Sequence, residues 1–299
     1  GWSDPVFAAA ARADSSLTLF EGWLGALAYA LQIYFDFSGY SDMAVGLGLL
    51  FGIVLPLNFN SPDKAASIID FWRAWHMTLS RFLRDYLYIP LGGGRKRRWL
   101  NLMTVMVLGG LWHGAGWTFV LWGTLHGVYL LVNHAFRAAC TRLGLTAAFP
   151  RPLAVGLTFL AVVTAWVPFR ADGLDAALAV WTAMAGMNGA ELGQFYRPLL
   201  GGLAPLMETL GIRFDMAPHF QPRGALAVLL LTALAWLAPN SQQMATALSG
   251  FTRLPTAPAP RLSCLAARLP VIAWTLGGAA LALGIAALCR STHFLYFQY

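Results

Sequence analysis

Apolar runs close to the length of a bilayer span recur along this chain of 299 residues and restrict the folds open to it. A membrane-spanning helix needs about 20 apolar residues, because the hydrocarbon core is about 30 Å thick. A further run, 100–112, is too short to span alone, and several others are short enough to indicate tilted or partly buried helices. The candidate spans are 17–35, 43–57, 117–136, 152–169, 223–238 and 269–289.

The charged residues of the chain are too few to cover a soluble protein of this size. They make up 11% of the sequence, where a soluble domain carries roughly a quarter, and apolar residues make up 58%. The net charge of +7 comes almost entirely from arginine, and no basic stripe with interleaved aromatic residues indicates a nucleic-acid partner. We therefore predict an all-α, polytopic membrane protein whose immediate partner is the lipid bilayer.

The distribution of basic residues predicts which connections face the cytoplasm, because positive loops are retained there. Basic residues gather at 95–98, 137–151 and 253–268, whereas the alternate connection, 170–222, carries five acidic residues. We predict that the three basic connections are cytoplasmic and that 189–222 forms an extramembrane loop. Because the sequence starts without Met or a signal peptide, we interpret residues 1–299 as the C-terminal part of one membrane domain whose N-terminal helices are missing.

Residues 60–94 differ from the other segments because their pattern is amphipathic. Ser61-Pro62-Asp63 is a helix start, and apolar and charged side chains then separate onto two faces at helical spacing. His76 falls in the apolar stripe. The pattern predicts one helix that lies at the interface or re-enters the membrane, ends at Pro90 and leads into a glycine turn and the basic loop at 95–98.

A single histidine, His113, lies among four glycines in the apolar segment 109–116 (GGLWHGAG). Glycine lets backbone approach a ligand and ends a helix that would otherwise continue. Non-helical backbone at membrane depth is tolerated where it lines a cavity or is buried in protein, and an ionisable group there is a functional candidate. A neutral imidazole can take the proton of an attacking hydroxyl and return one to a leaving thiolate. His113 is our first candidate, with a hydrogen bond to a neighbouring helix as the structural alternative.

His76 and His126 are weaker candidates on sequence pattern alone. A histidine on an apolar stripe is more often a buried residue with a hydrogen-bond partner, and helix packing explains His126 as well as function does. The pattern does not favour haem ligation by His113 and His126, because they lie thirteen residues apart, about 20 Å along one helix, and glycines interrupt that helix. We expect no prosthetic group.

Asp36 and Asp42 form a second polar cluster between two apolar runs. Carboxylates there can bind a cation, relay protons or brace a helix turn, so a proton-coupled transporter is an alternative function. Capping or bracing of the helix expected near Asp42 is the structural alternative. No metal is expected, because Cys140, Cys264 and Cys289 show neither metal-binding nor disulfide spacing. Motifs of serine hydrolases, nucleotide-driven pumps and zinc proteases do not occur.

Four motifs resemble, in the correct order, those of the membrane-bound O-acyltransferases (MBOAT), and within them the alginate O-acetyltransferase branch. They are YFDFSGYSD at 34–42, FWRAWHMTLS at 71–80, RDYLYIPLGG at 84–93 and GLWHG at 110–114. Weaker matches follow at 122–127, 166–171, 239–243 and 294–297. Ala74 departs from the family pattern, which often has arginine or another polar residue there.

The resemblance implies an O-acyltransferase with two histidines in its active site. His113 corresponds to the near-invariant family histidine, and His76 corresponds to the second active-site position. The resemblance also implies a tunnel from the cytoplasm to an outward funnel, with a thioester donor, acetyl-CoA, on the inner side.

Two further sets of residues are assigned to binding. The basic cluster would attract the phosphates of the donor, unless it serves only to set topology. Its members are Arg95, Lys96, Arg97 and Arg98. The substrate-binding candidates are Trp72, Trp112, His126, Asp36 and Asp42.

The resemblance therefore predicts transfer of acetyl groups across the bacterial inner membrane to hydroxyls of an exported, alginate-like polysaccharide. A periplasmic acetyltransferase-like or esterase-like partner would pass the group to the polymer. Teichoic acid, peptidoglycan, cellulose or a lipid are alternative acceptors.

Overall fold

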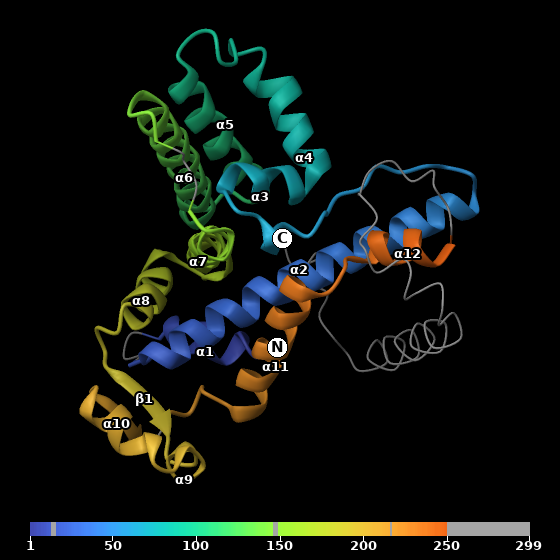
Figure 1. Ribbon diagram of the computed structural model, residues 1–299. Coiled ribbons are helices and arrows are strands. Elements are labelled where there is room, and N and C mark those ends of the chain that lie inside the picture. Colours follow the sequence, from blue (N-terminus) through green and yellow to red (C-terminus); the bar gives the residue numbers. More distant parts are fainter. Residues whose placement is uncertain (13–15, 146–148, 216, 250–299) are drawn as a thin grey trace.

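The computed structural model describes residues 1–12, 16–145, 149–215 and 217–249, which form an almost entirely helical structure (Figure 1). The predicted span 269–289 and the basic connection at 253–268 lie outside the described residues. The elements in chain order are α1 (Asp4–Ala10), α2 (Leu19–Leu50), η1 (Pro62–Lys64), α3 (Ile68–Ala74), α4 (Met77–Phe82), the π-helix η2 (Leu83–Tyr88), α5 (Arg98–His113), α6 (Trp117–Arg142), α7 (Arg151–Arg170), α8 (Leu174–Met184), β1 (Ala190–Gly193), α9 (Tyr196–Leu200), α10 (Leu203–Thr209), β2 (Ile212–Asp215), α11 (Pro222–Leu237) and α12 (Ser241–Ser249).

Helix α2 is one continuous helix of 32 residues that runs through the molecule. It begins with a capping box, in which the backbone N–H of Thr18 donates to Glu21 Oε2 (3.0 Å). The prediction of two separate spans, 17–35 and 43–57, was wrong, because α2 continues through the polar stretch between them, including Gly39. The chain leaves α2 only at Gly52, whose φ of 72° suits glycine.

Asp42 braces two helices instead of starting one. Its carboxylate accepts hydrogen bonds from Ser241 Oγ and from Gln242 Nε2 (2.6 Å), both in the first turn of α12. These bonds hold α12 alongside α2, as Figure 1 shows. Of the interpretations open from the sequence, bracing is the one that matches this geometry.

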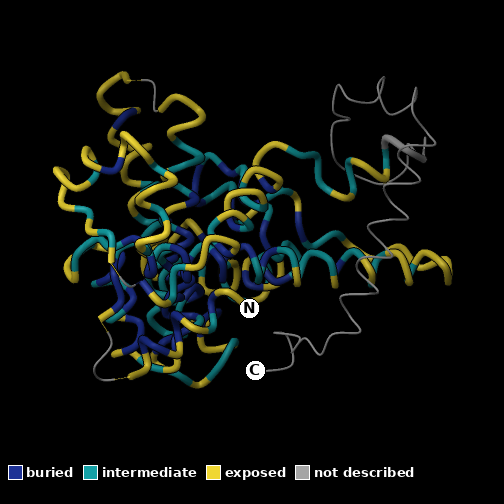
Figure 2. Tube along the Cα trace, turned by 90° about the horizontal axis from the view of Figure 1, so that it is seen from below, coloured by how far each residue is buried: buried dark blue, intermediate teal, exposed yellow. Residues whose placement is uncertain are grey.

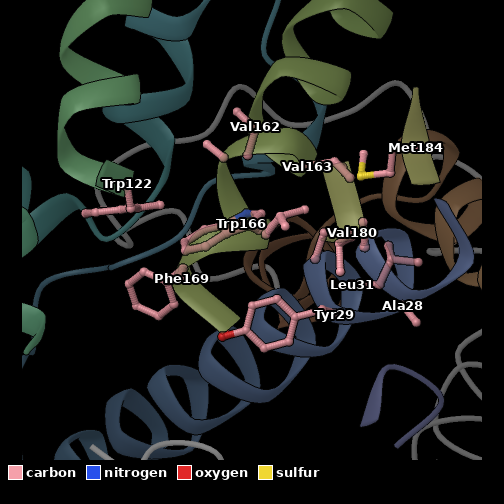
Figure 3. Packing of buried hydrophobic residues seen from close by; sticks show 14 of the residues in the cluster. Ala28, Tyr29, Leu31, Trp122, Val162, Val163, Trp166, Phe169, Val180 and Met184 are labelled. Carbon is pink, nitrogen blue, oxygen red and sulfur yellow. The ribbon is translucent and has the colours of Figure 1, made fainter. Parts of the chain in front are cut away.

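A single hydrophobic core connects α2 with α7 and α8. Val163 and Val167 of α7 and Val180 of α8 are 0% exposed, and each buried side chain of this size contributes roughly 1.5–3 kcal/mol. Figure 3 shows Trp166 and Phe169 of α7 beside Trp122 of α6. Figure 2 shows that burial concentrates around this region, whereas the C-terminal end of α2 is exposed. The core therefore fixes α7 between α2 and α6.

The segment 60–90 is not the single amphipathic helix that its pattern predicts. Helix α3 ends before Trp75, and α4 begins after His76, whose φ of 39° lies in the left-handed region. The preceding segment takes the hydrogen bonds that a continuous helix would use: Met77 N–H donates to Asn58 O, and Asn60 N–H donates to Ala74 O, both at 2.9 Å. His76 therefore lies at a break between helices rather than in a continuous apolar stripe.

Helices α5 and α6 pack with their backbones in contact. A Cβ atom on Gly110 would lie 2.3 Å from the carbonyl oxygen of Phe119, and one on Gly123 would lie 2.3 Å from that of Met106. No L-residue with a side chain fits at either position without displacing a backbone. This contact fixes the end of α5 against α6.

Among the described helices, α6 and α7 are long and apolar enough to cross a bilayer. Helix α5 has 16 residues and is therefore about 24 Å long, which agrees with the prediction that 100–112 is too short to span alone. The remaining predicted spans stay predictions.

The connection 189–222 contains structure that the prediction of an all-α fold missed. Strands β1 and β2 pair in parallel, with Ala190 opposite Ile212 and Gly193 opposite Asp215, and α9 and α10 lie between them. Four-residue strands carry too short a pattern to separate from loop. Its predicted position outside the membrane stays a prediction.

The α5–α6 contact predicts a stability effect. Gly110→Ala should lower the free energy of unfolding by about 1–3 kcal/mol, because the new methyl group overlaps the Phe119 carbonyl. Thermal unfolding of the purified chain in detergent measures the change. Gly156→Ala in α7 is the matched control, since no atom lies within 4 Å of its new Cβ, and it should leave the midpoint unchanged or raise it. Equal midpoints for the two variants would contradict the contact.

Candidate active site

His113 is the last residue of α5 and lies where the helix stops. The chain becomes extended at Gly114 (φ 168°, ψ 151°), and α6 begins at Trp117. The sequence prediction of a glycine-dependent helix end at this point is therefore confirmed, although Gly109 and Gly110 serve packing inside α5 rather than the break.

The His113 ring is half-buried between aromatic side chains from three helices. Its centroid lies 4.9 Å from that of Trp112, 5.2 Å from that of Trp122 and 5.1 Å from that of Phe169. All three ring pairs are T-shaped, and the His113 side chain remains partly exposed. Trp112 is 60% exposed beside it and forms the outer rim of this end of α5.

An aromatic wall connects the surroundings of His113 with those of His76. We use this name for Trp75, Trp122, Trp166 and Phe169. Trp122 stacks on Trp166 (5.7 Å, 25°), and Trp166 contacts Trp75 (5.0 Å). Trp75 sits directly before His76, so residues from α3, α6 and α7 form one continuous apolar surface. Each of its four side chains is at most 5% exposed, so water does not reach the wall itself.

His76 is held by a hydrogen-bonded strap that the sequence reasoning missed. Asn58 Oδ1 contacts His76 Nδ1 at 3.3 Å and accepts from Thr78 N–H (3.3 Å) and Thr78 Oγ1 (2.6 Å). Because an amide oxygen only accepts, the His76 contact requires a proton on Nδ1 and leaves Nε2 without one. The ring of Phe37 packs edge-on against His76 at 4.8 Å. Asn58 is therefore a positioning residue for His76.

The two predicted catalytic histidines come together in the structure. They lie on different segments, yet His113 is the ionisable side chain whose charge acts on His76. Positive charge on one ring opposes positive charge on the other. At most one of the two rings therefore carries a positive charge.

His126 and Trp72 form a buried cluster behind the aromatic wall. His126 is 0% exposed, stacks on Phe71 (5.9 Å, 16°) and contacts Trp122 (4.9 Å). Among the described residues, both His126 ring nitrogens and the indole nitrogens of Trp72 and Trp122 have no hydrogen-bond partner. Each unsatisfied group costs roughly 1–3 kcal/mol. His126 supports the wall from inside and offers no accessible surface to a substrate.

A cavity of about 520 Å³ opens on the other side of Trp72. It lies between α3, α4 and η2 on one side and α5 and α6 on the other. Apolar side chains line its interior, including Val105 and Met106, and its basic residues are Arg73, Arg81, Arg84 and His134. Trp72 belongs to this lining and lies 5.9 Å from Trp122, the indole that contacts His113. The cavity and the histidine site therefore share one wall.

Only some of the arginines that line this cavity form ion pairs with acidic residues. Arg84 Nε lies 2.7 Å from Asp85, and Arg73 lies 3.5 Å from Asp70. In the described part of the chain, Arg81 has no ion-pair partner. An anionic group at this mouth would meet a net positive field.

The basic loop 95–98 adjoins the same cavity through one residue. Arg98 donates to the ring of His134, with 3.0 Å between Arg98 Nη2 and His134 Nδ1. Asn101, another residue that the sequence reasoning missed, secures the loop, because its Nδ2 donates to the carbonyls of Leu91, Gly93 and Lys96 (2.8–3.1 Å). A polar residue in the apolar run 100–112 was the only signal for it.

The two carboxylates predicted to bind substrate, Asp36 and Asp42, do not join the histidine site. Asp36 has an exposed side chain on α2, next to Phe37. Asp42 is occupied by its bonds to α12. Within the described ranges, no three His, Cys, Asp or Glu side chains come together as a metal site would require.

Comparison with known proteins identifies the family to which the chain belongs. Residues 10–164 match the sequence profile of the membrane-bound O-acyltransferase family, MBOAT. The chain is 52% identical over 181 residues to a peptidoglycan O-acetyltransferase of Helicobacter pylori, covering 60% of this chain and 34% of the relative. It is 50% identical over 173 residues to a probable alginate O-acetylase AlgI of Azotobacter vinelandii, covering 57% and 34%. It is 45% identical over 231 residues to a probable alginate O-acetylase AlgI of Pseudomonas aeruginosa, covering 75% and 42%.

The chain spans between about a third and two fifths of the length of these relatives. The matched region contains α2 to α6 and most of α7, and therefore both histidines and the cavity. The chain belongs to the membrane-bound O-acyltransferase family.

Proposed function

We propose that the protein transfers an acetyl group from a thioester donor to hydroxyl groups of an exported envelope polysaccharide. The observation that carries this proposal is the position of His113. It ends a helix before a glycine and is half-buried against the aromatic wall, which continues to Trp75, the residue before His76. An imidazole in such a place can exchange protons with a substrate while bulk water is largely excluded.

The chemistry is an acyl transfer with one proton passed through an imidazole. His113 removes the proton of the acceptor hydroxyl as its oxygen attacks the thioester carbonyl. The carbon–sulfur bond then breaks, and the proton moves from His113 to the leaving thiolate, so the products are an ester and a free thiol. His76, with its proton held on Nδ1 by Asn58, offers Nε2 to the acceptor hydroxyl and orients it.

The donor is acetyl-CoA, entering through the cavity lined by Trp72 and Met106. Its volume of about 520 Å³ lies within the range of ligand pockets. The phosphates would meet Arg73, Arg81 and Arg84 at the mouth. The apolar interior would take the extended arm towards Trp72. Met106 is seven residues before His113 on α5, a rise of about 10 Å, so the thioester has to reach past Trp122. Of the basic loop, Arg98 is the member that reaches this cavity, through His134.

An alginate-like polysaccharide is the favoured acceptor, because two of the relatives reported above bear the name alginate O-acetylase. Peptidoglycan is the second candidate, favoured by 52% identity to the Helicobacter pylori relative. Both acceptors lie outside the inner membrane. We therefore place the protein in that membrane, with the donor on the cytoplasmic side and a periplasmic partner receiving the acetyl group. Mass spectrometry of acetyl esters on surface polymers and on peptidoglycan, with and without the gene, separates the two acceptors.

His113→Ala should lower polymer O-acetylation by at least 100-fold, because general acid–base groups contribute 10²–10⁴. The measurement is ester content per polymer unit in cells that express the variant at the wild-type level. His219→Ala is the control, since in this structure the backbone N–H of His219, not its side chain, bonds Glu21. Wild-type acetylation by a folded His113→Ala protein would end the proposed role.

Asn58→Ala should lower turnover by about tenfold, because the His76 ring loses an orienting hydrogen bond of about 1–1.5 kcal/mol, together with the two bonds from Thr78 to the same oxygen. Initial rates of acetyl transfer by the purified protein measure the effect. In a His76→Ala background the same substitution should change the rate by less than about twofold, because the two residues act as one unit. Asn188→Ala, which removes a bond to the Leu17 carbonyl outside the site, is the control. Additive losses would show that Asn58 acts independently of His76 and would contradict its role in positioning that ring.

Arg81→Gln should raise the donor KM about fivefold, as expected for a loss of about 1 kcal/mol per charge near a phosphate. Arg73→Gln and Arg84→Gln should act in the same direction, with smaller effects because acids partly match these residues. An acetyl thioester of pantetheine, which lacks phosphates, should be turned over equally by wild type and variants. Arg197→Gln in α9, paired with Glu208, is the control. An unchanged KM in all three variants would place the donor elsewhere.

A further inference from the structure

A second cavity, of about 760 Å³, lies on the opposite side of α6 from the donor cavity. It runs between α6 and α7, the two helices long and apolar enough to cross a bilayer, and is closed at one end by the start of α3. Nothing in the acyl-transfer chemistry above uses it.

The interior of this cavity is apolar and exposed. Val132 is 60% exposed and Leu157 is 49% exposed. Phe136 and Phe149 stack at 5.5 Å with an interplanar angle of 10° and form a flat side wall. Exposed apolar side chains of this kind between two spans face hydrocarbon rather than water.

The mouth of the same cavity is positively charged. Arg137, near the end of α6, and Arg151, at the start of α7, both line it. Within the described ranges, neither arginine has an ion-pair partner, and Arg137 makes only a long contact of 3.4 Å with Ser67 Oγ. Asp70 is the acid of the lining, but it accepts from Ser67 Oγ at 2.6 Å and lies 3.5 Å from Arg73, so its charge is matched within α3.

A buried acceptor completes the set of groups around this mouth. Asn133 Oδ1 is buried and has no hydrogen-bond partner in the described structure, and Asn133 lines the cavity one turn before Arg137. An acceptor beside two arginines suits a ligand that carries both a phosphate and a hydroxyl. Arg98, whose guanidinium donates to the ring of His134, brings one further positive charge to the same end of the α5–α6 pair.

We propose that this cavity binds one anionic glycerophospholipid of the phosphatidylglycerol type, as a structural lipid. Arg137 and Arg151 hold its phosphate, Asn133 accepts from its headgroup glycerol, and an acyl chain lies along Val132, Phe136 and Leu157. Basic pockets between membrane helices attract anionic lipid headgroups, and polybasic ends meet the negative leaflet. The site goes beyond the acyl-transfer activity and is independent of its acceptor.

The test uses the full chain in nanodiscs of known lipid composition and in detergent with added lipid. Native mass spectrometry should show one long-chain phosphatidylglycerol retained about tenfold more than phosphatidylcholine. The Arg137→Gln/Arg151→Gln protein should lose this preference while its unfolding midpoint in phosphatidylcholine stays at the wild-type value. The matched double control is Arg142→Gln/Arg223→Gln, which removes two exposed arginines outside the cavity and should keep the preference.

Three results would overturn the proposal. One is equal retention of the two lipids by the wild type, which would show that the cavity does not select phosphatidylglycerol. A second is an equal loss of preference in the control, which would show a general charge effect. The third is retention of inorganic phosphate or dihexanoyl phosphatidylglycerol as strong as that of the long-chain lipid, which would exclude a role for the apolar side chains of the cavity. All three are read without acetyl transfer, so they stand apart from the test of His113.

Discussion

The contact between the backbones of α5 and α6 is the constraint on which the site depends. Gly110 and Gly123 leave no room for a Cβ atom, so the two helices approach as closely as main chains allow. This approach brings the end of α5 against Trp122 and keeps His113 within 5.2 Å of that indole. Any larger residue at these positions would move the end of α5 relative to α7. The geometry of the site is thus set by the absence of side chains at two positions, one a turn before His113 and the other next to Trp122.

A second constraint is the broken helix around His76. A non-glycine residue in the left-handed region costs on the order of 1–3 kcal/mol and persists only where its surroundings over-determine it. Asn58 fixes the backbone at His76 through two groups: its backbone carbonyl accepts from Met77 N–H, and its side-chain oxygen contacts His76 Nδ1 and Thr78 Oγ1. The bonds cross from an extended segment to a helix start. They orient His76 and satisfy polar groups that the break between α3 and α4 would otherwise leave without partners.

Features encoded by local pattern were predictable, and features encoded by distant contacts were not. The apolar runs at 117–136 and 152–169 became α6 and α7, because continuous apolar stretches of that length have few other folds. The helix end at His113 followed from glycine chemistry. The break before His76 did not, because its cause is Asn58, 18 residues earlier. The continuity of α2 was also not predictable from the sequence, because the polar residues at 36–42 resemble a loop. The hydrogen bond from Gln242 of α12 to Asp42 becomes evident only in the folded structure. The aromatic wall required three helices to meet and has no signature in any one of them.

Helix α6 separates the donor cavity from the lipid cavity by its periodicity. Trp122, His126, Leu130 and His134 recur every four residues and face α3 and the donor cavity. Val128, Val132 and Phe136 repeat at the same spacing but are offset by two residues, which is about 200° around a helix, and line the other cavity. A substitution in one set of residues can therefore change the ligand of its own cavity without altering the lining of the other cavity. The helix itself still couples them mechanically, because a lipid that fixes the Arg137 end also fixes the tilt of the Trp122 end. An anionic lipid in the groove would thus stabilise the wall that holds His113 without touching the reacting atoms.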